Sequence, residues 1–279
     1  MKFININPGW GTIVYANIDE VLSIESNFWT KLGYERDLIL FKGLGNISNN
    51  EYYDLVSKFG NPWAPAEYVH SNEIPFYFDT NDKTKCITKF SNKLSKLGNV
   101  EMPWHVDIPH WGEKSYPWRS LYNIKNPNPF DGLTSWVNLR LDLINPTNQE
   151  LLLYNNITVT LQSWHQNGID EPDITLPYIK EHVVTNVKSL RSNYFVSKKS
   201  SKHAWIKQTF INDIPVDNYK VLGNIHKIIS NKKELVYTHQ WEETDLIIYD
   251  NWNLMHKRTG LNLNSDEERL FHRVNIHHK

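Results

Sequence analysis

Short runs of strand-forming residues follow one another along most of this chain, and many of them end at proline, glycine or asparagine. The clearest of these runs are residues 11–15, 37–41, 116–124, 157–161, 205–211, 235–241 and 246–249. Apolar residues at helical spacing predict a helix capped by Asn17 or Asp19 and running to about Leu32. A second helix is predicted from Ser48 to Phe59, with Gly60 as its C-terminal stop. Shorter helices are predicted later, over residues 139–145, 148–154 and 221–230.

The chain has no internal repeat, low-complexity tract or linker that would divide it, so we expect one domain over residues 1–279. Many short strands with helices concentrated early favour a mainly β fold with helices. The fold we expect is a double-stranded β-helix (jelly roll, cupin-like) core decorated by α-helices. Residues 162–203 form the least regular region, for which we predict a lid or a substrate-shaping insertion.

Composition excludes several classes of protein. Cys86 is the only cysteine, so neither an intrachain disulfide nor a cysteine-based zinc site can form. The 30 basic and 31 acidic residues give a net charge of −1, which does not favour a general nucleic-acid or membrane-surface binder. No signal peptide or transmembrane segment is evident. We therefore expect a cytoplasmic protein without nucleic-acid or membrane partners; the sequence is also compatible with a homo-oligomer.

The first chemical signal is a histidine and an aspartate two positions apart. His105 and Asp107 lie in the stretch Met102–Trp111, among apolar and aromatic residues that favour a strand. Residues two apart on a strand point to the same face, so both side chains could converge on one divalent metal ion. The pair alone is a common pattern, and two ligands do not hold a catalytic metal.

A third candidate ligand follows a buried strand near the end of the chain. His256 stands 149 positions after Asp107 (256 − 107), at the end of the stretch Asp250–His256. Strands that are distant in sequence can be neighbours in a jelly roll. His105, Asp107 and His256 would then form the two-histidine, one-carboxylate triad of non-heme iron oxygenases, which leaves coordination positions open.

Two arginines follow this histidine on a further predicted strand. Arg269, Phe271 and Arg273 share one face of the strand at residues 269–276. If that face points into the barrel, two buried guanidinium groups require anions, and a guanidinium pairs well with a carboxylate. Two inward arginines beside a metal triad are therefore candidate ligand-binding residues.

These motifs, in this order, resemble one family. His-X-Asp, then Asp-Asn-X-X-X-X-His, then Arg-X-X-X-Arg resembles the 2-oxoglutarate-dependent taurine dioxygenase and chlorophenoxyacetate dioxygenase (TauD/TfdA-like) family. The N-terminal half is also similar, through Leu40–Gly43 and the Phe59-Gly60 pair, and Gly132-Leu133-Thr134 resembles the family's Gly-Asp-Thr. The resemblance spans about residues 11–276.

The resemblance implies cofactors and roles for particular residues. His105, Asp107 and His256 would bind Fe(II), which reacts with 2-oxoglutarate and O2. Arg269 would pair with the distal carboxylate of 2-oxoglutarate, helped by the Thr134 hydroxyl. Arg273 would lie on the side of the substrate.

The chain also departs from the family pattern. Asn61-Pro62-Trp63 stands where taurine dioxygenase has a histidine that helps to hold the sulfonate, so taurine is not the expected substrate. Three further residues are candidates for lining the substrate pocket: Glu101, Trp104 and His110. For Trp104, an ordinary place in the core is the alternative.

The resemblance implies an oxidoreductase that hydroxylates a C–H bond of a small polar or anionic metabolite, such as an amino acid-like compound, a sulfonate or a carboxylate. Succinate and CO2 would be released. Two alternatives stay open. The same cofactors could support desaturation or cyclisation in a biosynthetic pathway, or the chain could be a non-catalytic jelly-roll binding protein.

Overall fold

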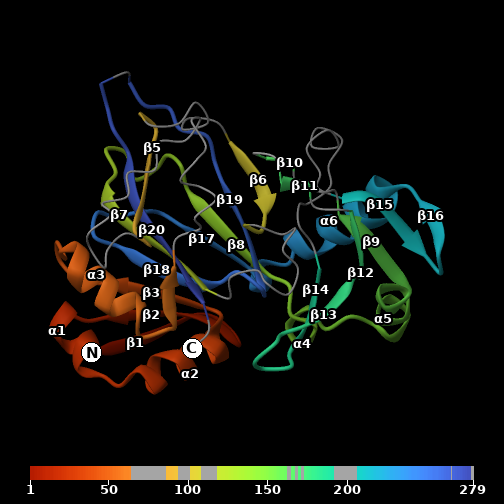
Figure 1. Cartoon of the computed structure of the whole chain (residues 1–279), viewed down its shortest axis with the longest axis horizontal. Coiled ribbons are helices and arrows are strands. Elements are labelled where there is room, and N and C mark those ends of the chain that lie inside the picture. Colours follow the sequence, from red (N-terminus) through yellow and green to blue (C-terminus); the bar gives the residue numbers. More distant parts are fainter. Residues whose placement is uncertain are drawn as a thin grey trace.

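The computed structural model describes residues 1–63, 86–93, 101–107, 118–161, 173–191, 206–264 and 266–277, and the backbone of residues 165–166 and 169–170. Within these residues, two mainly antiparallel sheets face each other across a shared core (Figure 1). Helices cover the outer face of the larger sheet, and a further small sheet with helices covers the outer face of the other. The predicted jelly-roll core with helical decoration is confirmed.

The larger sheet has eight strands in the order β1-β2-β3-β18-β7-β20-β4, and β5 also pairs with β20. Its strands are β1 (Lys2–Asn7), β2 (Trp10–Tyr15), β3 (Leu38–Lys42), β4 (Asn61–Trp63), β5 (Thr88–Ser91), β7 (Trp118–Lys125), β18 (Leu246–Asp250) and β20 (Leu270–His277). Only β2 and β3 run parallel; the other pairs are antiparallel. β18, from the C-terminal part of the chain, pairs with β3 on one side and with β7 on the other. Strands from the N-terminal and C-terminal parts of the chain are therefore neighbours in one sheet.

The smaller sheet has four antiparallel strands in the order β17-β8-β19-β6. Its strands are β6 (Met102–His105), β8 (Thr134–Asn138), β17 (Val236–His239) and β19 (Leu254–Arg258). On its inner face, Trp136 packs against Tyr249 of the larger sheet, with ring centroids 5.7 Å apart. Leu254 and Phe271 belong to the same buried cluster, so apolar side chains fill most of the space between the sheets.

Three helices cover the outer face of the larger sheet: α1 (Ile18–Ser23), α2 (Ser26–Arg36) and α3 (Asn49–Val56). Asn17 and Ser48 begin α1 and α3 through capping boxes, each with a glutamate three residues later. The predicted cap at Asn17 is confirmed. The prediction of one helix from there to about Leu32 is wrong, because the backbone becomes extended at Ile24 and divides the helix into two. The second helix continues past Leu32 to Arg36.

Gly60 has a different role from the one its position suggests. We expected it to stop the second helix, but α3 already ends at Val56. A Cβ at Gly60 would lie 1.9 Å from the carbonyl oxygen of His277. The glycine therefore allows β4 to approach and pair with the end of β20.

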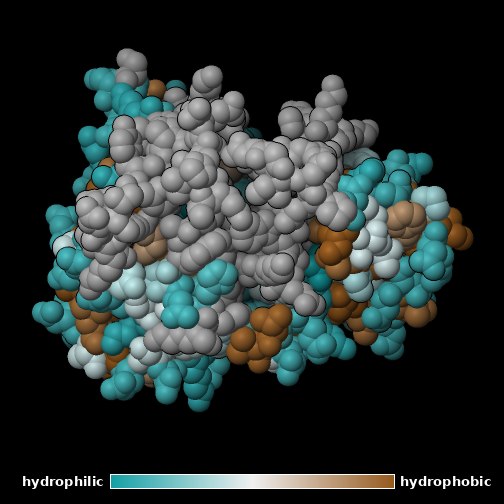
Figure 2. Space-filling model, viewed as in Figure 1, coloured by the Kyte–Doolittle hydropathy of each residue, from teal (hydrophilic) through white to brown (hydrophobic). Residues whose placement is uncertain are grey.

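The outer face of the smaller sheet carries the remaining elements. A second four-stranded sheet has the order β12-β9-β15-β16. These strands are β9 (Ile157–Leu161), β12 (Ile174–Pro177), β15 (Ile206–Ile211) and β16 (Ile214–Val216). The helices beside them are α4 (Leu141–Ile144), α5 (Asn148–Asn155), a π-helical turn (Tyr219–Gly223), α6 (Asn224–Ser230) and a 3-10 turn (Lys233–Leu235). Figure 2 shows that hydrophobic side chains gather on this side of the molecule, where Leu152 and Ile214 are exposed.

Two short hairpins complete the described chain: β10 (His165–Gln166) with β11 (Ile169–Asp170), and β13 (Ile179–Glu181) with β14 (Lys188–Leu190). The insertion expected over residues 162–203 lies partly outside the described residues, so its role as a lid stays a prediction. None of the described helices combines the length and apolar character needed to cross a membrane.

Candidate active site

His105, Asp107 and His256 lie close together in the structure. Their potential ligand atoms lie within 4.8 Å of one another. Nε2 of His256 is 3.5 Å from Oδ2 of Asp107, and Nε2 of His105 is 4.0 Å from Oδ1. The three residues that the sequence analysis predicted as ligands are therefore brought together.

Sheet pairing places the two histidines. His105 on β6 is the register partner of His256 on β19, and their ring centroids are 4.2 Å apart. Nδ1 of His105 lies 2.6 Å from the carbonyl oxygen of Pro103. A carbonyl oxygen can only accept a hydrogen bond, so Nδ1 carries the proton and Nε2 presents its lone pair to the site.

Both imidazoles are held in the uncharged state that a metal ligand requires. Burial lowers the pKa of His105, although the neighbouring Asp107 opposes this shift. Burial lowers the pKa of His256 to about 3.

Asp107 reaches the site in a way that the sequence analysis did not predict. The strand ends at His105, and Asp107 lies in the bend that follows, so the expected alternation along one strand is wrong. Asn251 fixes the bend: its Nδ2 donates to the carbonyl oxygen of Asp107 (2.9 Å), and its Oδ1 accepts from the Asp107 amide (3.1 Å). Two hydrogen bonds from a residue at the end of β18 thus hold the ligand's backbone.

The Asp107 carboxylate is surrounded by donors and cations. Nη1 of Arg119 lies 3.0 Å from Oδ2, and the Tyr249 hydroxyl donates to the same oxygen at 3.3 Å. Nη1 of Arg273 lies 3.9 Å from Oδ1. Burial would raise the pKa of Asp107, but the positive charges of Arg119 and Arg273 hold it well below its usual range. The carboxylate is therefore an anion.

Arg269 occupies a separate part of the interior. Its Nη2 donates to the carbonyl oxygen of Gly132 at 2.9 Å, and its guanidinium lies 4.2 Å from the centre of the Phe271 ring. Burial, followed by the charge of Arg258, lowers the pKa of Arg269. Its Nε is buried and has no hydrogen-bond partner among the described residues. Such a group is ready to receive an anion.

Thr134 lies at the same end of the interior, two residues after Gly132. Its side-chain oxygen accepts a hydrogen bond from Nε1 of Trp241 at 2.9 Å, which leaves the hydroxyl proton free to point elsewhere. In the ladder of β8 and β19, Thr134 is the register partner of Arg258.

Arg273 has different surroundings from Arg269. Its guanidinium lies 4.1 Å from the centre of the Phe90 ring and close to Asp107. Asp107 is therefore an interior acid that contacts Arg273, whereas Glu101 is exposed.

Of the remaining predicted residues, Trp104 lies on the outer side of the smaller sheet. Trp104 packs against the outer cluster of the smaller sheet, and Nζ of Lys257 lies 5.0 Å from its ring centre. His105, its chain neighbour, points inward instead. His110 lies outside the residues that the structure describes.

The sequence analysis missed Arg119, Tyr249 and Asn251. Arg119 is fully buried, and an arginine within the apolar run of β7 was the available signal. Asn251 was visible as part of the Asp-Asn motif, but nothing in the sequence assigned it a partner 144 residues away.

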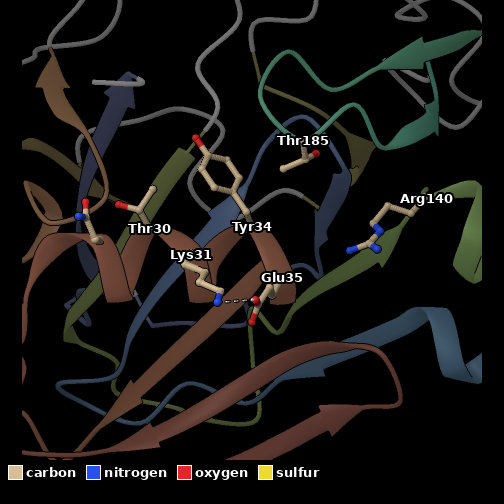
Figure 3. A pocket seen from close by; sticks show the side chains of 7 residues that line it. Thr30, Lys31, Tyr34, Glu35, Arg140 and Thr185 are labelled. Carbon is tan, nitrogen blue, oxygen red and sulfur yellow. Dashed lines mark ion pairs between the residues drawn. The ribbon is translucent and has the colours of Figure 1, made fainter.

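A cavity of about 640 Å³ opens elsewhere, beside α2 (Figure 3). Its lining includes Tyr34, Arg140 and Thr185, and Lys31 and Glu35 form an ion pair at 3.9 Å along one side. No triad residue lines this cavity. We therefore assign the chemistry to the interior of the barrel.

Two neutral imidazoles and one carboxylate at these distances fit a divalent metal of the non-heme iron type, with coordination positions left for other ligands. On a jelly-roll core, this defines a mononuclear metal enzyme of the oxygenase class.

The family model described as "Taurine catabolism dioxygenase TauD, TfdA family" matches residues 5–275. The chain belongs to this family, whose members are 2-oxoglutarate-dependent dioxygenases that use Fe(II), 2-oxoglutarate and O2. Among curated proteins, none matches the chain in sequence.

Solved structures with the same fold are distant in sequence. AAD-2, in complex with Mn(II) and N-oxalylglycine, is 13% identical with a TM-score of 0.70, covering 100% of this chain and 97% of its own. A taurine dioxygenase from Burkholderia xenovorans is 14% identical with a TM-score of 0.66, covering 100% and 91%. The PvcB protein from Pseudomonas aeruginosa is 15% identical with a TM-score of 0.65, covering 96% and 86%.

Proposed function

We propose that this dioxygenase hydroxylates a C–H bond of a small polar or anionic metabolite: an amino acid-like compound, a sulfonate or a carboxylate. Succinate and CO2 are the other products. The observation that carries the proposal is the convergence of His105, Asp107 and His256 within 4.8 Å, in an interior that also contains Arg269 and Arg273.

His105, Asp107 and His256 hold the metal. When bound, Fe(II) supplies the oxidising chemistry together with 2-oxoglutarate and O2. The protein contributes two imidazole nitrogens without protons and one charged carboxylate. The pairing of β6 with β19 and the hydrogen bonds of Asn251 hold these donors in position before the metal arrives.

Arg269 and Thr134 hold the distal carboxylate of 2-oxoglutarate. A buried guanidinium with an Nε lacking a partner among the described residues gains most from an anion. The Thr134 hydroxyl can donate to the same carboxylate, because its oxygen already accepts from Trp241. Neither side chain contacts Asp107, so this anion site is separate from the metal ligands.

Arg273 holds an anionic group of the substrate. It lies on β20, whose first residue follows Arg269, and its Nη1 is 3.9 Å from Oδ1 of Asp107. Arg273 follows Arg269 by four residues, so their Cα atoms are about 13 Å apart in a fully extended chain. The two guanidinium groups therefore serve two different anions, and the substrate carries a carboxylate, a sulfonate or a similar group.

Desaturation and cyclisation would use the same residues and would differ only in how the substrate lies. The mass of the product separates these outcomes, since hydroxylation adds one oxygen atom and the other two reactions add none. An intact triad that leaves metal positions open, together with the buried Arg269, argues against a non-catalytic binding protein.

Substrate-stimulated succinate release tests the proposal. Purified protein with Fe(II), 2-oxoglutarate and O2 is offered amino acids, sulfonates, betaines and carrier-bound acyl groups, with His256→Ala as the control. We expect stimulation by a compound with an anionic group and a product heavier by one oxygen atom. Stimulation only by cationic or uncharged compounds would contradict the role of Arg273.

A further inference from the structure

Arg119 is the most deeply buried charged residue beside the triad, with no exposed surface. It lies on the central strand β7, between its register partners Tyr249 of β18 and Asn275 of β20. Leu121, two residues later on the same face, belongs to the cluster between the sheets, so the arginine also points into the barrel.

The two oxygens of Asp107 have unequal surroundings. Oδ2 lies 3.0 Å from Nη1 of Arg119 and accepts from the Tyr249 hydroxyl at 3.3 Å. Oδ1 has a more distant cation, Arg273, at 3.9 Å. Asn251 fixes the backbone of Asp107 through its amide and its carbonyl oxygen, so the carboxylate enters the site from a defined position.

The charge of Arg119 makes Oδ2 of Asp107 a less favourable ligand for a metal ion than Oδ1. A divalent ion bound to Oδ2 would lie close to the Arg119 guanidinium, and two cations repel each other strongly in a buried site. An ion bound to Oδ1 lies farther from that charge.

We propose that Arg119 is a positioning residue that reserves Oδ2 of Asp107, so that the aspartate binds the metal through Oδ1 alone. The consequence concerns the number of positions left for other ligands. A carboxylate bound through both oxygens would take a position that a chelating cosubstrate or O2 requires. This inference concerns metal coordination and holds whichever substrate the enzyme uses.

Protein loaded with Mn(II) tests the proposal without turnover. Crystal structures of the wild type, Arg119→Met and Arg119→Lys show which oxygens bind the ion. Pulsed electron paramagnetic resonance in isotopically labelled water counts the exchangeable waters on it. We expect Oδ1 alone on Mn(II) in the wild type. In Arg119→Met, both oxygens should bind, with one water fewer. Arg119→Lys should restore the single-oxygen mode, because it retains the charge.

Arg140→Met is the matched control. It removes another buried arginine–aspartate pair, in which Nη1 of Arg140 lies 3.1 Å from Oδ2 of Asp37, outside the triad. The number of exchangeable waters on Mn(II) in Arg140→Met should equal that in the wild type. Wild-type protein with Oδ2 on the metal overturns the proposal, even if Arg119→Met does not fold. An unchanged oxygen and water count in folded Arg119→Met also overturns it.

Discussion

His105 and His256 face each other directly across the ladder of β6 and β19, with ring centroids 4.2 Å apart. The register of two strands therefore sets the spacing of two metal ligands. Because the backbone holds each ring, replacing one imidazole removes a ligand without moving the other.

The first prediction concerns these ligands. In anaerobic protein with Fe(II) and 2-oxoglutarate, His105→Ala and His256→Ala should each abolish the weak visible charge-transfer band of the complex, since two remaining ligands do not hold the metal. Absorption spectroscopy measures the band, and circular dichroism checks the fold. A band of unchanged intensity in both variants would refute the triad.

The second prediction separates the two arginines. Arg269→Ala should weaken 2-oxoglutarate binding by about 2–5 kcal/mol, as expected when one partner of a buried charge pair is truncated. Arg273→Ala should weaken it far less, but should abolish stimulation by the substrate. Titration by tryptophan fluorescence gives the first quantity, and succinate assays give the second. Equal losses of 2-oxoglutarate affinity would disprove the division of roles.

The third prediction concerns Gly132, which has a φ of +60°. A Cβ there would lie 2.3 Å from Cδ2 of Leu261 and 3.2 Å from Cζ of Arg269. Gly132→Ala should therefore displace Arg269 and weaken 2-oxoglutarate binding about tenfold, or about 1.4 kcal/mol.

Gly45→Ala is the control for this change. Gly45 also has a positive φ (+73°), but a Cβ there would meet no atom within 4 Å. Both variants should lose stability through backbone strain of about 1–2 kcal/mol. Only Gly132→Ala should alter the dissociation constant of 2-oxoglutarate; a similar change in Gly45→Ala would point to a general effect of strain.

The fourth prediction concerns acid stability. Burial lowers the pKa of His226 from 6.5 to about 3, so the folded protein holds this ring uncharged while the unfolded chain protonates it. The stability this residue contributes is complete above about pH 6.5 and is lost as the pH falls towards 3. Between these values, His226→Phe should reduce the dependence of the unfolding free energy on pH by about 1.4 kcal/mol per pH unit.

Urea unfolding of the two proteins at a series of pH values measures this slope. The comparison uses the slope and not the stability itself, because the substitution also removes the 3.4 Å contact between His226 and the Tyr178 hydroxyl. Parallel curves for wild type and variant would show that His226 does not titrate as described.

Much of this architecture was predictable from local patterns. Buried strands such as β3 and β18 are continuous apolar runs, and Ser48 with Glu51 gave α3 its start. β1 was missed because most of its residues are exposed, so no buried face repeats along it. The interruption at Ile24 left the apolar spacing intact and could not be read from it.

The metal ligands of the site could be predicted from the sequence, because their residue types and order are distinctive. The contacts that position these ligands could not, because they depend on the tertiary structure. His105, Asp107 and His256 are chemically distinctive residues in a recognisable order. The pairing of Arg119 with Asp107 depends on the bend after β6 and on the packing of β7 beside β18. Spacing along the chain contains no information about that contact.

The hydrogen bonds between Asn251 and Asp107 have a consequence for protein synthesis. They join residues 144 positions apart, and His256 follows five residues after Asn251. Until residues 251–256 have been synthesised, a nascent polypeptide that already contains His105 and Asp107 lacks the third ligand and the hydrogen bonds that hold the second. Domains generally fold as units during synthesis, so the metal is acquired only after the chain has emerged beyond His256.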